Sequence, residues 1–246
     1  MSAISITSLA NPGRFAAIAG FLSPWLAGLT ALLFGVGLYL ALYVAPVADL
    51  HGETYRILFV HVPAAWLGTF VFASMAVSAL GTLIFRHPLA DVAQKAAAPL
   101  GAGFTALCLI TGSIWGRPAW GTWWEWRDAR LTSMFVLLLI YLGIMALWRA
   151  MDDPSKAARA VAIVTLVGSI NLPIIKFSVD WFYTLHQPAS VMTLQGPKIH
   201  PSMLTPLLLL GLAYLMLHVT LMLMLMRAEL MERRARRLAI ASAMGA

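Results

Sequence analysis

The sequence has one cysteine, Cys108, and few charged residues. A single thiol excludes an internal disulfide and a CxxCH haem-attachment motif, and its position in an apolar run indicates a small packing residue. Charged residues make up 11% of the 246 residues, whereas a soluble domain has about 25%. Hydrophobic residues make up 61%, and the mean hydropathy is +0.82. The composition therefore predicts one polytopic membrane domain over residues 1–246.

The motifs of common catalytic sites are also missing. We find no Walker A loop, no HExxH, no nucleophile elbow and no carboxylate pair at catalytic spacing. No enzyme is therefore expected, and any ATP hydrolysis must come from a partner. The first twenty residues lack the pattern of a cleavable signal peptide. The net charge of +7 does not indicate nucleic-acid binding, because the basic residues lie between apolar runs and form no stripe.

Six apolar segments are long enough to cross a membrane as helices, which takes about 20 residues each. They lie at about 24–44, 58–85, 99–116, 131–149, 160–178 and 203–226. Backbone groups in lipid must be paired internally, and no segment shows the alternation of a barrel strand. We therefore expect an all-α fold with six transmembrane helices.

The positive charges predict the topology of these spans. With both termini in the cytoplasm, eleven of the 17 Lys and Arg lie on the cytoplasmic side, as the positive-inside rule requires. The bias depends on a basic tail, 227–246, whose arginines 233, 234, 236 and 237 are expected to bind anionic membrane lipid. The outer loops are then about 45–57, 117–130 and 179–202, and a kink is expected at Pro173 in the fifth span.

The second outer loop, about 117–130, is rich in tryptophan. It and the residues just before it hold five of the nine tryptophans, together with several charged residues: Trp115, Trp120, Trp123, Trp124, Trp126, Arg117, Arg127, Arg130, Glu125 and Asp128. One interpretation is a platform for a flat macrocycle, with an arginine paired to carboxylates such as haem propionates. The other is an ordinary aromatic belt, although a belt spreads its rings over all helix ends. Asp128 accepts hydrogen bonds only, so we expect it to hold a loop N–H, an arginine or a partner protein.

Two histidines from different spans are predicted to lie at one level. His61 is 24 residues before Phe85, and His186 is nine residues after Phe177, which places both at the outer edge of the membrane. Two facing imidazoles would supply both axial ligands of a haem iron. The alternative is that each is an interfacial histidine bonded to backbone or water. His218, inside the sixth span, is expected to be neutral and hydrogen-bonded within the bundle.

Several of these segments together resemble one family. The run Gly121-Thr-Trp-Trp-Glu-Trp-Arg-Asp-Ala-Arg-Leu-Thr-Ser133 resembles the tryptophan-rich "WWD" signature of haem-handling proteins of cytochrome c biogenesis. The match is narrowed by Tyr55-Arg-Ile-Leu-Phe-Val-His-Val-Pro-Ala-Ala-Trp66, Asn171-Leu-Pro-Ile-Ile175 and Thr184-Leu-His-Gln187. Over about residues 20–230 the chain is similar to the CcmC family of system I.

The resemblance implies a function and a set of site residues. CcmC-type proteins hold haem b non-covalently, as cargo, at the periplasmic face of the bacterial inner membrane and present it to the haem chaperone CcmE. Further partners would be CcmD and the ABC-transporter subunits CcmA and CcmB. The family's axial ligands fall on His61 and His186, and its tryptophan motif on Trp115, Trp120, Trp123, Trp124, Trp126 and Asp128, with Arg117 and Arg130 as further candidates.

One residue departs from the family pattern. Arg127 stands between Trp126 and Asp128, where the usual motif has the two adjacent. The run Asp-Ala-Arg-Leu-Thr-Ser that follows is intact, so we expect the loop to absorb the insertion. Two other functions stay open at this point: a transporter subunit that exports haem across the membrane, and a scaffold whose aromatic loop binds a protein and no ligand.

Overall fold

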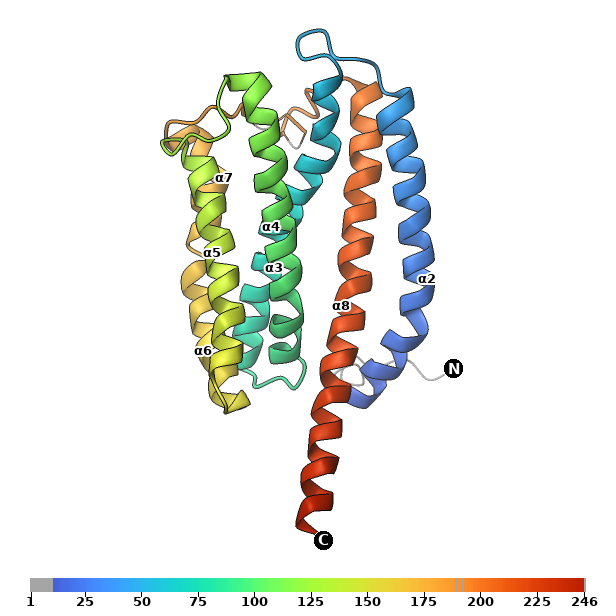
Figure 1. The fold of residues 1–246 in the computed structure, drawn as a ribbon, viewed down its shortest axis with the longest axis vertical. Helices are drawn as coiled ribbons and strands as arrows, with labels where there is room; N and C mark the ends of the chain where they lie inside the picture. Colours follow the sequence, from blue (N-terminus) through green and yellow to red (C-terminus); the bar gives the residue numbers. More distant parts are fainter. Residues whose placement is uncertain (1–10, 189, 192, 246) are drawn as a thin grey trace.

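The fold is a bundle of long helices, seen here in a computed structural model that describes residues 11–188, 190–191 and 193–245 (Figure 1). Six helical stretches are long and apolar enough to cross a membrane. They are α2 with a π-helical end (Pro12–Tyr39, Leu40–Val44), a 3-10 turn with α3 (Glu53–Ile57, Leu58–Leu83), α4 (Ala90–Trp120), α5 (Ala129–Ala150), α6 with α7 (Pro154–Gly168, Asn171–Trp181) and α8 (Pro201–Met244). The all-α prediction with six membrane-spanning helices is confirmed.

The helices are longer than the apolar runs that predicted them. α2 begins at Pro12 because the Asn11 side chain accepts the free N–H groups of the next residues, Gly13 and Arg14. α4 continues to Trp120 and α5 begins at Ala129, so the second loop is only 121–128. Part of the predicted loop 117–130 therefore belongs to helix ends.

The fifth span is interrupted just before the proline that was expected to kink it. α6 ends at Gly168 and α7 begins at Asn171, so Pro173 lies in the first turn of a new helix. Pro173 has no N–H for the carbonyl of Ser169, four residues earlier, and its ring crowds that carbonyl, which is where the helix breaks. The predicted interruption of the fifth span at Pro173 is confirmed.

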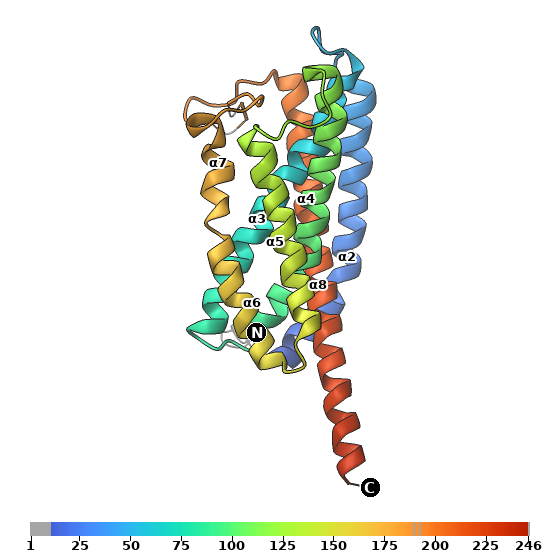
Figure 2. The same ribbon diagram turned by 60° about the vertical axis from the view of Figure 1, so that its left-hand side comes forward.

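The chain connections gather at the two ends of the bundle (Figures 1 and 2). Residues 45–52, 121–128, 182–188, 190–191 and 193–200 lie at one end. It is called here the histidine end, because α3 begins there with His61 and because His186 lies in the connection that follows α7. α2 begins and α8 finishes at the opposite end, called the tail end. That the tail end faces the cytoplasm stays the prediction of the charge pattern.

Close helix packing fixes the centre of the bundle. The Tyr141 hydroxyl donates to the Gly68 carbonyl at 2.8 Å, which joins α5 to α3. A Cβ on Gly101 of α4 would lie 2.1 Å from the Tyr141 ring, so the aromatic ring rests on bare helix backbone. This fully buried contact holds three helices in register with the site above them.

Ion pairs tie α8 to α4 at the tail end. Arg233 pairs with Asp91 of α4 and with Glu229 of its own helix, both at 2.7 Å, and Lys95 pairs with Glu229 at 2.7 Å. Beyond these pairs α8 runs on along the bundle axis, past the ends of its neighbours (Figures 1 and 2). The tail, expected to bind lipid headgroups, is thus a continuous extension of the last span.

Candidate functional site

His61 is held at the start of α3 by two groups of α4. Its Nδ1 lies 3.0 Å from the Cys108 carbonyl and 3.0 Å from the Thr111 hydroxyl oxygen. Because a carbonyl only accepts, we assign the ring proton to Nδ1. The other nitrogen, Nε2, then carries the free lone pair that a metal ligand needs, and no described residue bonds to it.

His186 is held in the same way by a different acceptor. Its Nδ1 lies 3.1 Å from Asp128 Oδ2 and 3.2 Å from the Thr184 hydroxyl. A carboxylate accepts, so Nδ1 again carries the proton and Nε2 the lone pair. Both histidines thus use Nδ1 for the protein and leave Nε2 for a ligand, which is the usual arrangement of metal-bound imidazole.

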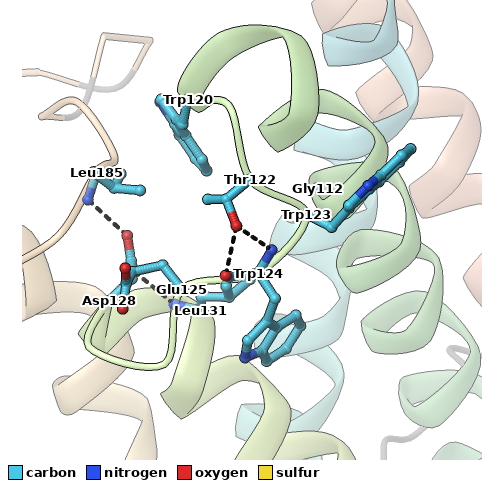
Figure 3. Close-up of a pocket in the computed structure, with 9 residues that line it drawn as sticks. All are labelled: Gly112, Trp120, Thr122, Trp123, Trp124, Glu125, Asp128, Leu131 and Leu185. Atoms are coloured by element: carbon cyan, nitrogen blue, oxygen red, sulfur yellow. Dashed lines mark hydrogen bonds between the residues drawn. The ribbon is translucent and has the colours of Figure 1, made fainter.

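Asp128 is the centre of the network around His186. Its carboxylate is fully buried and caps α5 by accepting from the Leu131 N–H at 2.9 Å. Its second oxygen accepts from the Leu185 N–H at 2.6 Å (Figure 3). The same oxygen accepts from the Thr184 hydroxyl at 3.0 Å and from the His186 ring. Burial alone raises the pKa of Asp128, but the hydrogen bonds from His186, Leu131 and Leu185 outweigh it and hold the pKa well below its usual range.

A small recess of about 10 Å³, room for about one water molecule, lies beside the loop 121–128 (Figure 3), and its lining residues include neighbours of both histidines but neither histidine itself. One of its lining residues, Gly112, lies next to His61, because a Cβ on Gly112 would be only 3.0 Å from the His61 Cε1. Another, Trp120, packs against His186, with ring centroids 5.0 Å apart and an angle of 66° between the ring planes. It is lined by Gly112, Trp120, Thr122, Trp123, Trp124, Glu125, Asp128, Leu131 and Leu185.

The size of the recess limits how a ligand would fit. Pockets that enclose a drug-sized ligand hold about 300–1,000 Å³, far more than the roughly 10 Å³ here. A macrocycle would therefore lie mostly outside the recess or widen it. No group of three or more His, Cys, Asp or Glu in the described residues is placed to hold a bare metal ion. Two imidazoles suit a metal whose other ligands come from a porphyrin.

This geometry and the sequence agree with one protein family. The family model described as "Heme exporter protein C", CcmC, matches residues 5–241. The chain belongs to the CcmC family. A heme exporter protein C of Bradyrhizobium diazoefficiens is 57% identical, over 99% of this chain and 95% of its own length. That of Escherichia coli K12 is 45% identical, over 94% and 93%, and a putative cytochrome c biosynthesis ccmC-like mitochondrial protein of Marchantia polymorpha is 46% identical, over 75% and 77%.

The five tryptophans of the CcmC motif do not form one surface. Trp120 lies against His186, whereas Trp115, one and a half turns earlier on α4, packs edge-on against His51 at 4.8 Å and Tyr55 at 5.7 Å. Trp115 thus braces the first connection at the histidine end. Its place on a ligand platform stays a prediction.

The remaining three tryptophans lie in the loop itself. Trp124 and Trp126 pack edge-on at 5.2 Å, and both contact Phe135 of α5. Trp123 is 58% exposed and points away from Asp128 (Figure 3). The Trp124 indole N–H is buried with no acceptor among the described residues, so Trp124 anchors the loop by packing.

The candidate arginines differ in what their guanidinium groups contact. Arg117 donates to the Gly121 carbonyl at the end of its own helix, and Arg130 donates to the Ser178 hydroxyl at 3.1 Å. Arg127, the residue inserted in the CcmC pattern, pairs with Glu125 at 3.4 Å and keeps its side chain 84% exposed. The loop absorbs the insertion, as expected, since the Asp128 side chain still caps α5.

Sequence reasoning missed several residues of this site and was wrong on one. Thr184, Thr111 and Gly112 all shape the surroundings of the histidines, and only Thr184 carried a signal, as part of a segment shared with the family. His218 was expected to be hydrogen-bonded. Its Nδ1 is instead buried with no partner among the described residues, and the ring packs edge-on against Phe70 and Phe104.

Proposed function

We propose that this protein binds haem b as non-covalent cargo between His61 and His186 and presents it to CcmE during cytochrome c maturation. The observation that carries the proposal is the matched state of the two imidazoles. Each has its Nδ1 occupied by a protein acceptor and its Nε2 free, and each lies next to a residue that lines one recess, Gly112 for His61 and Trp120 for His186. The names of the relatives, heme exporter protein C, support haem as the ligand.

The surrounding side chains have separate roles in this proposal. His61 and His186 ligate the iron, and Trp120, beside His186, lies against the porphyrin. Trp123 and Trp126, 58% and 66% exposed, offer apolar surface to the rest of the macrocycle or to the chaperone. Arg127, with its side chain 84% exposed, is free to meet a propionate, and Arg117 and Arg130 are further candidates.

The proposed setting is the inner membrane, with the histidine end in the periplasm. The protein acts as a carrier and not as an enzyme, so the energy for releasing the loaded chaperone comes from CcmA with CcmB, while CcmD completes the assembly. Six membrane-spanning helices and the charge pattern of the tail support this setting.

The test is the optical spectrum of the purified protein. We expect a bis-histidine haem spectrum, which the variant with both His61→Ala and His186→Ala loses. His87→Ala is the matched control, because His87 is exposed in the short connection at the tail end. A double variant with an unchanged spectrum would refute the ligand assignment.

A transporter subunit that exports haem is the second candidate, favoured by the word "exporter" in the names of the relatives. Haem supplied to vesicles from one side only separates the two. Loading from the periplasmic side alone supports presentation, and loading from the cytoplasmic side alone supports export. A colourless protein that still captured CcmE would instead indicate a scaffold.

A further inference from the structure

We infer that Asp128 is a positioning residue that orients His186 and makes the two axial histidines unequal ligands. The inference rests on the proposed ligation of haem by His61 and His186. It gives Asp128 a role through His186, and not the direct contact with haem that its place in the tryptophan motif would suggest.

The first argument is the contrast between the two Nδ1 acceptors. His186 donates to a carboxylate at 3.1 Å, whereas His61 donates to a neutral backbone carbonyl at 3.0 Å. A carboxylate behind a ligating imidazole raises its basicity more than a neutral acceptor does, since hydrogen bonds to charged groups are about twice as strong. His186 is therefore the stronger electron donor to the iron.

The second argument is that hydrogen bonds within the protein occupy both carboxylate oxygens of Asp128. The side chain is 0% exposed, and its two oxygens accept from four donors, one in the first turn of α5 and three in the connection after α7. A backbone bond from the Ala129 N–H to the Tyr183 carbonyl, 3.1 Å, reinforces the link. Asp128 lines the recess, but both of its oxygens are taken up by hydrogen bonds within the protein, so its effect on a ligand passes through the ring of His186.

The third argument is the position of this link in the fold. Asp128 closes the tryptophan loop 121–128, and His186 lies in the connection 182–200. Because Asp128 holds the His186 ring, the orientation of an iron ligand depends on the loop that carries Trp123, Trp124 and Trp126. A contact made on that loop, by a macrocycle or by a chaperone, is thereby transmitted to His186.

The reduction potential of the bound haem tests the inference. A basic ligand favours ferric over ferrous haem, so Asp128→Asn should weaken that preference about tenfold, a positive shift of about 59 mV for one electron. Asp180→Asn is the matched control, because it removes the same charge from an exposed position at the histidine end. An Asp128→Asn protein with a bis-histidine spectrum and an unchanged potential overturns the inference.

A second measurement decides the matter if Asp128→Asn does not fold. In His186→Gly, imidazole added to the haem-loaded protein has an N–H for Asp128, and 1-methylimidazole has none. We expect imidazole to bind about tenfold more tightly, and equal affinities overturn the inference. A wild-type protein without a bis-histidine spectrum would instead refute the proposed function, so the two failures are distinguishable.

Discussion

Replacing Gly112 with alanine tests whether His61 holds the ligand in the position described. The new Cβ would lie 3.0 Å from His61 Cε1, 3.6 Å from Nδ1 and 4.0 Å from Nε2. Carbon atoms in contact prefer about 3.5–4.0 Å, so the ring must withdraw by about half an ångström. The ring is held to the Cys108 carbonyl at 3.0 Å, and a bond stretched to about 3.6 Å is no longer a hydrogen bond.

The cost of this displacement sets the expected change in haem binding. A net hydrogen bond contributes about 0.5–1.5 kcal/mol, and 1.4 kcal/mol corresponds to about tenfold in affinity. We therefore expect Gly112→Ala to weaken haem retention up to about tenfold, measured by titrating the purified protein with haem.

The matched control lies on the same helix. Gly103→Ala places a Cβ with nothing within 4 Å. Both substitutions raise helix propensity, by about 1 kcal/mol, so a general effect on α4 would appear in both. Full haem affinity in Gly112→Ala, with the fold intact by circular dichroism, would refute the placement of His61 beside the recess.

Three further predictions concern topology and stability. A membrane-impermeant thiol reagent applied to the periplasmic side should label Leu194→Cys and not Ala235→Cys, because the two lie at opposite ends of the bundle; the reverse pattern would invert the proposed orientation. Gly101→Ala should lower the unfolding temperature in detergent, because its Cβ would lie 2.1 Å from the Tyr141 ring and overpacking costs about 1–3 kcal/mol. Arg233→Ala should lower it less, since that partly exposed side chain joins a small ion-pair network and such pairs contribute up to about 1 kcal/mol each; a larger loss than for Gly101→Ala would contradict this ranking.

The sequence predicted the spans and the level of the two histidines because both follow from counting residues along apolar helices. The helix ends were harder to predict. They depend on local hydrogen bonds, such as the capping of α5 by Asp128, and continue past the apolar runs into polar residues. The interruption of the fifth span was predictable from Pro173, because a proline breaks a helix at the carbonyl four residues before it, here that of Ser169.

The arrangement of the site was predictable only in part. The acceptor of His61 is a backbone carbonyl, which every residue has, so no residue type could reveal it. Asp128 and Leu185 are bonded across 57 residues of sequence, and only the fold brings them together. The tryptophans were expected to act as one platform, but side-chain direction on α4 turns Trp115 and Trp120 toward different neighbours.

The divided fifth span bears on how the chain is threaded through the membrane. α6 has 15 residues and α7 has 11, lengths of about 22 Å and 16 Å, and neither alone reaches across about 30 Å of hydrocarbon. The two must therefore be inserted as one crossing. If they were not, His186 would stay at the tail end, and α8 would deliver its arginines to the same side as His61. The preference of the basic tail for the cytoplasmic side thus favours a full crossing by the divided fifth span. It thereby keeps the two proposed haem ligands on one side of the membrane.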